Sequence, residues 1–341
     1  MSPPQLPNHH HIVVLQGDFI QIPEFTLPEP YTFTSTIYPQ TSLSNLHERI
    51  HDASILVLCA FPVDASALSP EVSPYLKHIV IVASGTDCVD LKACRERGIT
   101  VTNCPGANVA AVSEHAIGLY FTTRRKIIDM HLRTRAGEWP KPKKGHLMFE
   151  FLDKDGTPPL TCEEEVVGII GNGGVGKRIA NLARGLGTKV LISGRKSPCS
   201  SVASGAEDRV PFDTVIKQST VLFLAIPLHE TTRNLISTPE LEAMSQHAVL
   251  INVSRGGVVD EEALVKALRE NKIAGAATDV FFKEPAGPEN SPLLAEGTED
   301  LNLVVTPHLA WLSQRTAKGY SKLLKDGVER WFTGERYHVV V

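Results

Sequence analysis

The segment Val166–Gly176 reads VVGIIGNGGVG, a buried apolar strand followed by a glycine-rich turn. Gly171, Gly173 and Gly176 fit the pattern GxGxxG, which binds the pyrophosphate of a dinucleotide where a strand leads into a helix. Gly171 permits the tight turn, Gly173 lets the backbone approach the phosphates, and Gly176 lets helix and strand pack closely. We therefore expect free N–H groups at the start of the helix to bind the phosphates.

The next strand of this unit, Val190–Ser193, ends in the turn Gly194-Arg195-Lys196. Folds that prefer NAD usually place an Asp or Glu here, hydrogen-bonded to the ribose 2′-hydroxyl. This turn has no carboxylate to repel a 2′-phosphate, and two cations with the Ser193 hydroxyl can bind one. The sequence thus favours NADP(H), with NAD(H) possible; the alternative is that the two cations are ordinary solvated turn residues.

Short β-branched runs alternate with longer helical stretches along the chain, which indicates parallel sheets covered by helices. Before the glycine turn, we expect strands at Ile12–Leu15, Ile55–Cys59 and Ile79–Ala83 and one long helix over Val109–Arg135. After it, we expect a helix at Gly176–Gly187, strands at Val190–Ser193, Val221–Ala225, Ala248–Val253, Ala276–Val280 and Leu303–Val305, and a final helix from Ser313 to about Phe332.

The length of 341 residues exceeds one compact core and suits two domains. We expect an α/β protein of two flavodoxin- or Rossmann-like domains, each a parallel sheet flanked by helices, with a cleft between the domains. Residues 1–113, completed by 316–341, would form the substrate domain. Residues 114–315 would form the NAD(P)-binding domain.

The composition excludes several classes of protein. Hydrophobic residues make up 42% and charged residues 21%, which is unlike a disordered chain. With 34 Lys and Arg against 38 Asp and Glu, the net charge of −4 gives no basic face for nucleic acid or for a membrane surface. No apolar stretch approaches the ~20 residues of a membrane span. The six cysteines never form CxxC, so we expect reduced thiols in the cytoplasm and neither a disulfide framework nor a metal site.

Three polar residues, Arg255, Glu284 and His308, each follow a different buried strand. Carboxyl ends of parallel strands share one edge of a sheet, where α/β folds bind ligands. A guanidinium can hold the carboxylate of a 2-keto acid, and an imidazolium can protonate the developing alkoxide. A carboxylate beside the imidazole would orient it and favour its charged form. A lone histidine is more often structural, but three such residues after successive strands favour a site.

With these motifs the sequence resembles the D-isomer-specific 2-hydroxyacid dehydrogenase family over nearly its whole length. The segments that carry the resemblance are Gly85–Asp87, Thr102–Gly106, Glu114-His115, Gly171–Gly176, Pro227–Thr232, Ile251–Asp260, Asp279–Pro285 and Pro307-His308. The resemblance implies reduction of a 2-keto acid to a D-2-hydroxyacid, and family members usually form homodimers. The helical stretch Val109–Arg135 and the loop after it are candidates for the dimer contact.

The resemblance also implies a role for individual residues. Arg255 would anchor the substrate, His308 would act as general acid and base, and Glu284 would pair with it. Ser84 and Gly85 would present backbone amides to the substrate carboxylate, and Asp279 would contact the nicotinamide carboxamide. The full set of expected cofactor contacts, from the motifs and the resemblance together, is Gly171, Gly173, Gly174, Val175, Gly176, Ser193, Gly194, Arg195, Lys196, Ile226, Pro227, Val253, Ser254 and Asp279.

Several residues near these motifs have competing interpretations. Trp311, three residues after His308, either faces the substrate or packs under the C-terminal helix. Asp260 is expected to be a helix cap, and Glu114 and His115 to make packing or hinge contacts.

The sequence is compatible with more than one 2-keto acid substrate. Glyoxylate and hydroxypyruvate suit a small pocket, whereas Trp311 leaves room for an aromatic or branched 2-keto acid. Two rival functions are a related fold acting on formate or phosphite, and a nucleotide-sensing interaction protein without turnover, like the corepressor members of the family. Turnover with a panel of 2-keto acids separates these alternatives.

Overall fold

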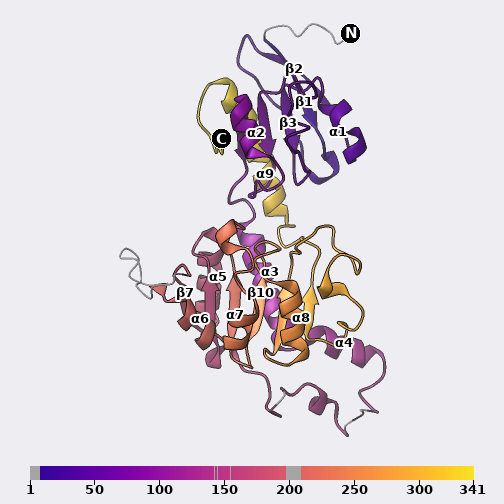
Figure 1. Cartoon of the computed structure of the whole chain (residues 1–341), viewed down its shortest axis with the longest axis vertical. Helices are drawn as coiled ribbons and strands as arrows, with labels where there is room; N and C mark the ends of the chain where they lie inside the picture. The colour runs from indigo at the N-terminus through magenta and orange to yellow at the C-terminus, as the bar shows by residue number, and fades with distance from the viewer. Residues whose placement is uncertain (1–7, 142, 144, 154, 197–208) are drawn as a thin grey trace. The chain divides into compact units, whose positions relative to one another are not determined.

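The computed structural model describes residues 8–196 and 209–341, apart from 142, 144 and 154 (Figure 1). The chain divides into two compact units, Met1–Asn108 with Leu312–Val341, and Val109–Trp311. The expected domain limits at 113 and 315 lie a few residues further along the chain, because the helix that starts at Val109 belongs entirely to the second unit. Cys199, one of the six cysteines considered above, lies outside the described residues.

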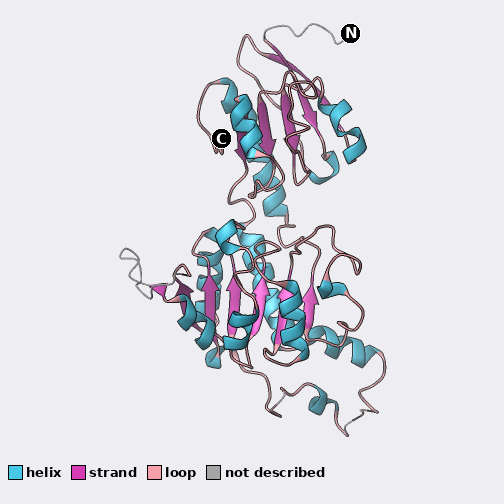
Figure 2. Ribbon diagram, in the orientation of Figure 1, coloured by secondary structure: helices cyan, strands magenta, loops and turns pink. Residues whose placement is uncertain are grey.

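The first unit is a five-stranded parallel sheet flanked by helices (Figure 2). Its strand order is β2 (Thr32–Ile37), β1 (His9–Val14), β3 (Ile55–Leu58), β4 (His78–Ile81) and β5 (Thr100–Asn103). Its helices are α1 (Leu43–Ile50), α2 (Leu91–Arg97) and α9 (Gln314–Phe332). Helix α9 packs on β4, and the N–H of Val340 donates to the carbonyl of Val101 at 2.7 Å, so the end of the chain completes this unit.

The second unit is a seven-stranded parallel sheet (Figure 2). Its order is β12 (Leu303–Val305), β11 (Gly275–Thr278), β10 (Val249–Asn252), β9 (Val221–Leu224), β6 (Val166–Ile170), β7 (Lys189–Ser193) and β8 (Arg209–Val210). Its helices are α3 (Val109–Arg124), α4 (Ile127–Arg135), α5 (Gly174–Gly185), α6 (Phe212–Gln218), α7 (Thr238–Ala243) and α8 (Glu261–Arg269).

Apolar side chains cover both faces of this sheet, as a parallel sheet requires. On one face Leu222 and Leu250 pack in a cluster with residues of α6, α7 and α8. On the other face Phe223 and Ile251 pack in a cluster with residues of α3 and α5. The predicted α/β class with parallel sheets is confirmed.

Every strand predicted from the sequence is present within a few residues of its expected position. The single helix expected over Val109–Arg135 is wrong, because α3 ends at Arg124 and α4 begins at Ile127. Lys126 between them has a left-handed backbone with φ 48°, which an α-helix cannot contain. The sequence also gave no signal for β2, β5, β8 and the short helices α1, α2 and α6.

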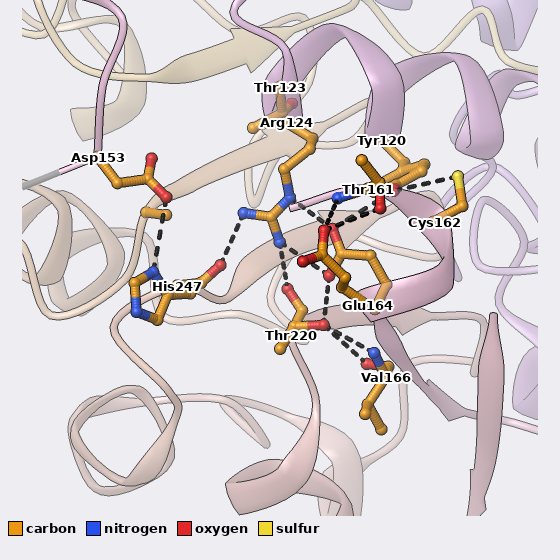
Figure 3. A network of polar contacts seen from close by, with 12 residues as sticks. Tyr120, Thr123, Arg124, Asp153, Thr161, Cys162, Glu164, Val166, Thr220 and His247 are labelled. Carbon is orange, nitrogen blue, oxygen red and sulfur yellow. Dashed lines mark hydrogen bonds and ion pairs between the residues drawn. The ribbon is translucent and has the colours of Figure 1, made fainter. Parts of the chain in front are cut away.

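A buried ion pair fixes the position of Arg124, the last residue of α3 (Figure 3). The Nε of Arg124 donates to Oε1 of Glu165 at 2.6 Å, and the two side chains are 2% and 0% exposed. The guanidinium also donates to the carbonyls of Thr220 at 2.9 Å and His247 at 2.8 Å. These three partners lie one or two residues before β6, β9 and β10, so Arg124 joins α3 to the amino ends of three strands. The carboxyl ends of the same strands lead into the glycine turn, Ile226 and Arg255.

Candidate functional site

The glycine turn between β6 and α5 has the geometry of a phosphate cradle. Gly171 has φ 113°, and a Cβ there would lie 2.2 Å from the carbonyl oxygen of Ala225. A Cβ at Gly176 would lie 2.0 Å from the carbonyl oxygen of Gly171, so both positions need glycine for packing. At Gly173, by contrast, nothing lies within 4 Å of a Cβ, and α5 begins at the next residue. Because the first N–H groups of a helix have no partner within it, these residues fit a dinucleotide phosphate.

The end of β9 adjoins this turn. A Cβ at Gly171 would lie 2.8 Å from a methyl group of Ile226, which shows how closely the two segments pack. The carbonyl of Pro227 accepts a hydrogen bond from the Thr232 hydroxyl at 2.9 Å, which holds the segment after the strand. The contacts of Ile226 and Pro227 with a cofactor stay predictions.

The turn after β7 contains no carboxylate of its own, but a carboxylate from α7 contacts it. Ser193 is buried, and its hydroxyl donates to the carbonyl of Gly194 at 2.7 Å. Arg195 and Lys196 are exposed. The Nζ of Lys196 donates to Oε1 of Glu240 in α7 at 2.7 Å, so a distant part of the chain brings a carboxylate to a turn that contains none.

His308 and Glu284 form a hydrogen-bonded pair at the carboxyl edge of the second unit's sheet. The Nδ1 of His308 lies 2.7 Å from Oε2 of Glu284, and the side chains are 41% and 36% exposed. The other oxygen of Glu284 accepts from the N–H of Phe281 at 2.9 Å. Burial raises the pKa of Glu284, but the hydrogen bond and charge of His308, the Phe281 N–H and the charge of Arg255 together outweigh it and lower that pKa. The carboxylate is therefore ionised at neutral pH and favours an imidazolium.

Arg255 is placed beside this pair by the loop after β10. Asn252, at the end of the strand, donates to the carbonyl of Arg255 at 3.1 Å and accepts from the Ser254 hydroxyl at 2.7 Å. A Cβ at Gly256 would lie 1.8 Å from the carbonyl oxygen of Phe281, so the loop packs directly on the segment that leads to Glu284. The structure thus brings Arg255, Glu284 and His308 together within one unit.

Asp279 holds the loop that carries His308. Its side chain is 2% exposed and accepts three hydrogen bonds, from the Thr306 hydroxyl at 2.6 Å and the N–H groups of Leu309 at 3.0 Å and Ala310 at 2.9 Å. These donors lie on both sides of His308, whose own backbone is left-handed with φ 55°. Sequence reasoning missed this role, and contact of Asp279 with a nicotinamide stays a prediction.

The residues on α3 make packing contacts. The Nε2 of His115 lies 3.1 Å from the Thr306 hydroxyl. Since that hydroxyl gives its hydrogen to Asp279, Nε2 of His115 is the donor, which fixes the tautomer of the ring. Glu114 pairs with Arg178 of α5 at 2.8 Å. His115 thus joins α3 to the loop that carries His308, and Glu114 joins α3 to α5.

Two further predictions concern Asp260 and Trp311. Asp260 is a helix cap, as expected, because its carboxylate accepts from the N–H of Ala263 at 3.1 Å. Trp311 is half-buried and packs on the apolar cluster between α3 and the sheet. Its contact with a substrate stays a prediction. Val253 and Ser254 are buried at the end of β10, and their contacts with a cofactor are likewise not tested.

The predicted carboxylate-binding amides lie in the first unit, in the turn after β4. Asn103 donates to the carbonyl of Ser84 at 2.8 Å, and the Ser84 hydroxyl donates to Asn108 at 3.0 Å. Within the described residues, the backbone N–H groups of Ser84 and Gly85 have no hydrogen-bond acceptor. The turn is thus fixed while its donors are available, and their role with substrate stays a prediction.

No helix in the part of the chain given above is both long and apolar enough to cross a bilayer. No group of three His, Cys, Asp or Glu side chains in the same residues is arranged to hold a metal ion.

Comparison with known proteins gives consistent matches. The family model described as "D-isomer specific 2-hydroxyacid dehydrogenase, NAD binding domain" matches residues 117–310. The chain is 36% identical to a glycerate dehydrogenase of Methylorubrum extorquens over 93% of its own length and 94% of the relative. It is 35% identical to a glyoxylate reductase of Thermococcus litoralis, over 85% and 84% of the two chains. A solved structure titled as an NADPH-dependent glyoxylate/hydroxypyruvate reductase from Sinorhizobium meliloti, in complex with NADP and malonate, matches with a TM-score of 0.74, at 25% identity over 97% of both chains.

Proposed function

Since this chain belongs to the D-isomer specific 2-hydroxyacid dehydrogenase family, we propose that it reduces glyoxylate or hydroxypyruvate and prefers NADPH to NADH. Reduction of a 2-keto acid to a 2-hydroxy acid is the activity common to its relatives. The product has the D configuration where it is chiral. Beyond this shared activity, we propose two specific features, namely a small 2-keto acid as substrate and a cofactor that carries a 2′-phosphate.

The observation that carries the function is the His308–Glu284 hydrogen bond of 2.7 Å with Arg255 beside it. With its hydrogen on Nδ1 directed to Glu284, the imidazole of His308 has Nε2 left to exchange a proton with the substrate oxygen. The ionised Glu284 stabilises the protonated ring that is the acid in the reductive direction. When bound, a nicotinamide cofactor supplies the hydride.

Arg255 supplies the second requirement, a fixed cation for the substrate carboxylate. A guanidinium presents paired donors in one plane, which match the two oxygens of a carboxylate and also polarise the neighbouring keto oxygen. The Asn252 and Ser254 contacts hold the backbone from which this side chain projects. Arg255 therefore orients the acid so that its keto oxygen meets His308.

The preference for NADPH is supported by the turn after β7. Arg195 is exposed there, and the turn itself contains no carboxylate that would repel a 2′-phosphate. A relative of known structure is described as NADPH-dependent and was solved with NADP. Small acids are supported by the names of the relatives, which are a glycerate dehydrogenase and glyoxylate reductases.

We also propose a homodimer in the cytoplasm. Several large apolar side chains of α4 and of the segment after it are exposed, and a second copy of the chain would cover them. These are Ile127, Ile128, Leu132, Trp139, Met148 and Phe149. The cysteines among the described residues carry no disulfide, which suits a reducing compartment. Sedimentation of the wild type and of a Leu132→Asp variant tests the dimer, which the variant should weaken.

The activity is tested by following oxidation of NADPH with 2-keto acids of increasing size, and then of NADH. We expect turnover with glyoxylate and hydroxypyruvate, a lower kcat/KM for branched and aromatic acids, and a higher kcat/KM with NADPH. A His308→Gln variant that is folded and still binds cofactor is the matched control, and its kcat should fall by about two orders of magnitude. Cofactor binding without oxidation of any acid would instead support the nucleotide-sensing alternative. Equal kcat/KM values for the two cofactors would refute the preference.

A further inference from the structure

The ammonium group of Lys196 is directed onto neighbouring helices. Its Nζ lies 2.7 Å from Oε1 of Glu240 in α7 and 5.5 Å from the ring centre of Phe212 in α6. The Lys196 side chain is 47% exposed, whereas that of Glu240 is 10% exposed. A lysine in an ion pair with a nearly buried carboxylate has much of its charge compensated before any ligand arrives.

Glu240 is itself held in place. It is the third residue of α7, and its Oε2 accepts from the N–H of Ser237 at 3.1 Å, as part of a capping box. The carboxylate therefore cannot swing away without losing a helix cap. Lys196, whose side chain is long and half-exposed, is the partner that can move.

We propose that Glu240 determines cofactor selectivity, because its carboxylate competes with the cofactor 2′-phosphate for Lys196. The inference rests on the proposed binding of that phosphate at the turn after β7. Arg195, one residue earlier, has no ion-pair partner among residues 8–196 and 209–341 and is the principal cation for the phosphate. Glu240 thus reduces the difference in affinity between NADP(H) and NAD(H) and allows NAD(H) to bind as well.

The charges give the direction of the effect. In the wild type, Lys196 must break a 2.7 Å ion pair to reach a phosphate, and Glu240 then remains as a negative charge near a dianion. Replacing Glu240 by Gln removes that charge and leaves the ammonium available. A positioning role for Glu240 would have the opposite sign, since Lys196 would then lose the contact that directs it to the phosphate.

The direct test measures binding of two nucleotide fragments by titration calorimetry, with no substrate present. Adenosine 2′,5′-bisphosphate carries the 2′-phosphate and adenosine 5′-monophosphate lacks it, so the ratio of their Kd values isolates the phosphate contact. We expect Glu240→Gln to tighten the bisphosphate about threefold to tenfold relative to the monophosphate. Glu242→Gln, the same charge change at an exposed position of the same helix, should leave the ratio unchanged.

Two more variants separate this inference from the proposed NADPH preference. Arg195→Met should lower selectivity for the bisphosphate more than Lys196→Met does, and neither variant alters the Glu240 cap. In the Lys196→Met background, Glu240→Gln should lose most of its effect, because the competition has been removed.

If neither cation affects the ratio, the proposed NADPH preference is wrong. If the cations do affect it but Glu240→Gln weakens the bisphosphate or changes nothing, the role given to Glu240 is wrong. A larger loss with Lys196→Met than with Arg195→Met would overturn that role as well.

Discussion

Replacing Glu284 by Gln tests the chemistry of the site through the pH dependence of the reaction. Reduction needs His308 protonated, so its rate is highest at low pH and falls as the pH rises through a midpoint. The Glu284 carboxylate, 2.7 Å from Nδ1, stabilises the protonated ring. Gln keeps an acceptor of similar size but removes the negative charge. The midpoint should therefore move to lower pH.

The exposure of the pair sets the size of the effect on the rate. A hydrogen bond between charged groups contributes roughly 1.5–3 kcal/mol when protected from water. The two side chains are 41% and 36% exposed, so solvent screening reduces the contribution to about 1 kcal/mol. That energy corresponds to a rate about fivefold lower above the midpoint.

The assay is kcat/KM for NADPH-dependent reduction between pH 5 and 9, at constant ionic strength. Glu289→Gln, the same charge change at an exposed position five residues away, is the control and should keep the wild-type midpoint. A folded Glu284→Gln variant whose midpoint is unchanged, or higher than that of the wild type, would refute the pairing of Glu284 with the catalytic proton.

Three other predictions concern stability and loop geometry. Arg124→Met should lower the free energy of unfolding by about 3–5 kcal/mol, because it leaves the buried Glu165 without its cation, whereas the exposed Arg125→Met should change it little; urea unfolding measures both. Asp279→Asn replaces a carboxylate that accepts three hydrogen bonds by an amide with one oxygen, so we expect stability to fall by about 2 kcal/mol and kcat to fall as well. If neither the stability nor kcat changed, the role of Asp279 in holding the His308 loop would be contradicted. Burial lowers the pKa of His78 to about 3 from 6.5, so the unfolded chain binds the proton first, and stability should fall as the pH drops from about 6.5 towards 3, by about 2 kcal/mol at pH 5. A His78→Phe variant should lose that part of the pH dependence, and an identical pH slope in the two proteins would count against the buried neutral ring.

The sequence predicted those parts of the fold that depend on local pattern. The tight turn at Gly171 and the close packing at Gly176 could be assigned from their spacing, and the structure shows close approaches that exclude a side chain at both positions. Arg255, Glu284 and His308 could be grouped because parallel strands bring their carboxyl ends to one edge.

Features that depend on partners far along the chain could not be predicted. The contacts of Arg124 with Glu165 and Thr220 are an example, because no helical periodicity encodes them. The carboxylate beside Lys196 comes from Glu240, which lies far along the chain in the first turn of α7. Strand β2 was missed because its side chains are mostly exposed and polar, so no apolar run marks it.

The division of the chain has a consequence for synthesis on the ribosome. The second unit is one continuous stretch inserted into the first, and α9 returns after it to stack Trp331 on His78 of β4, with ring centres 5.2 Å apart. The strands of the first unit are synthesised first, but α9 can pack on their sheet only after the whole inserted unit and α9 itself have been translated. Until then, one side of that sheet stays uncovered. Nascent chains stalled before α9 should consequently expose apolar surface to chaperones, although their dinucleotide-binding segment is already complete.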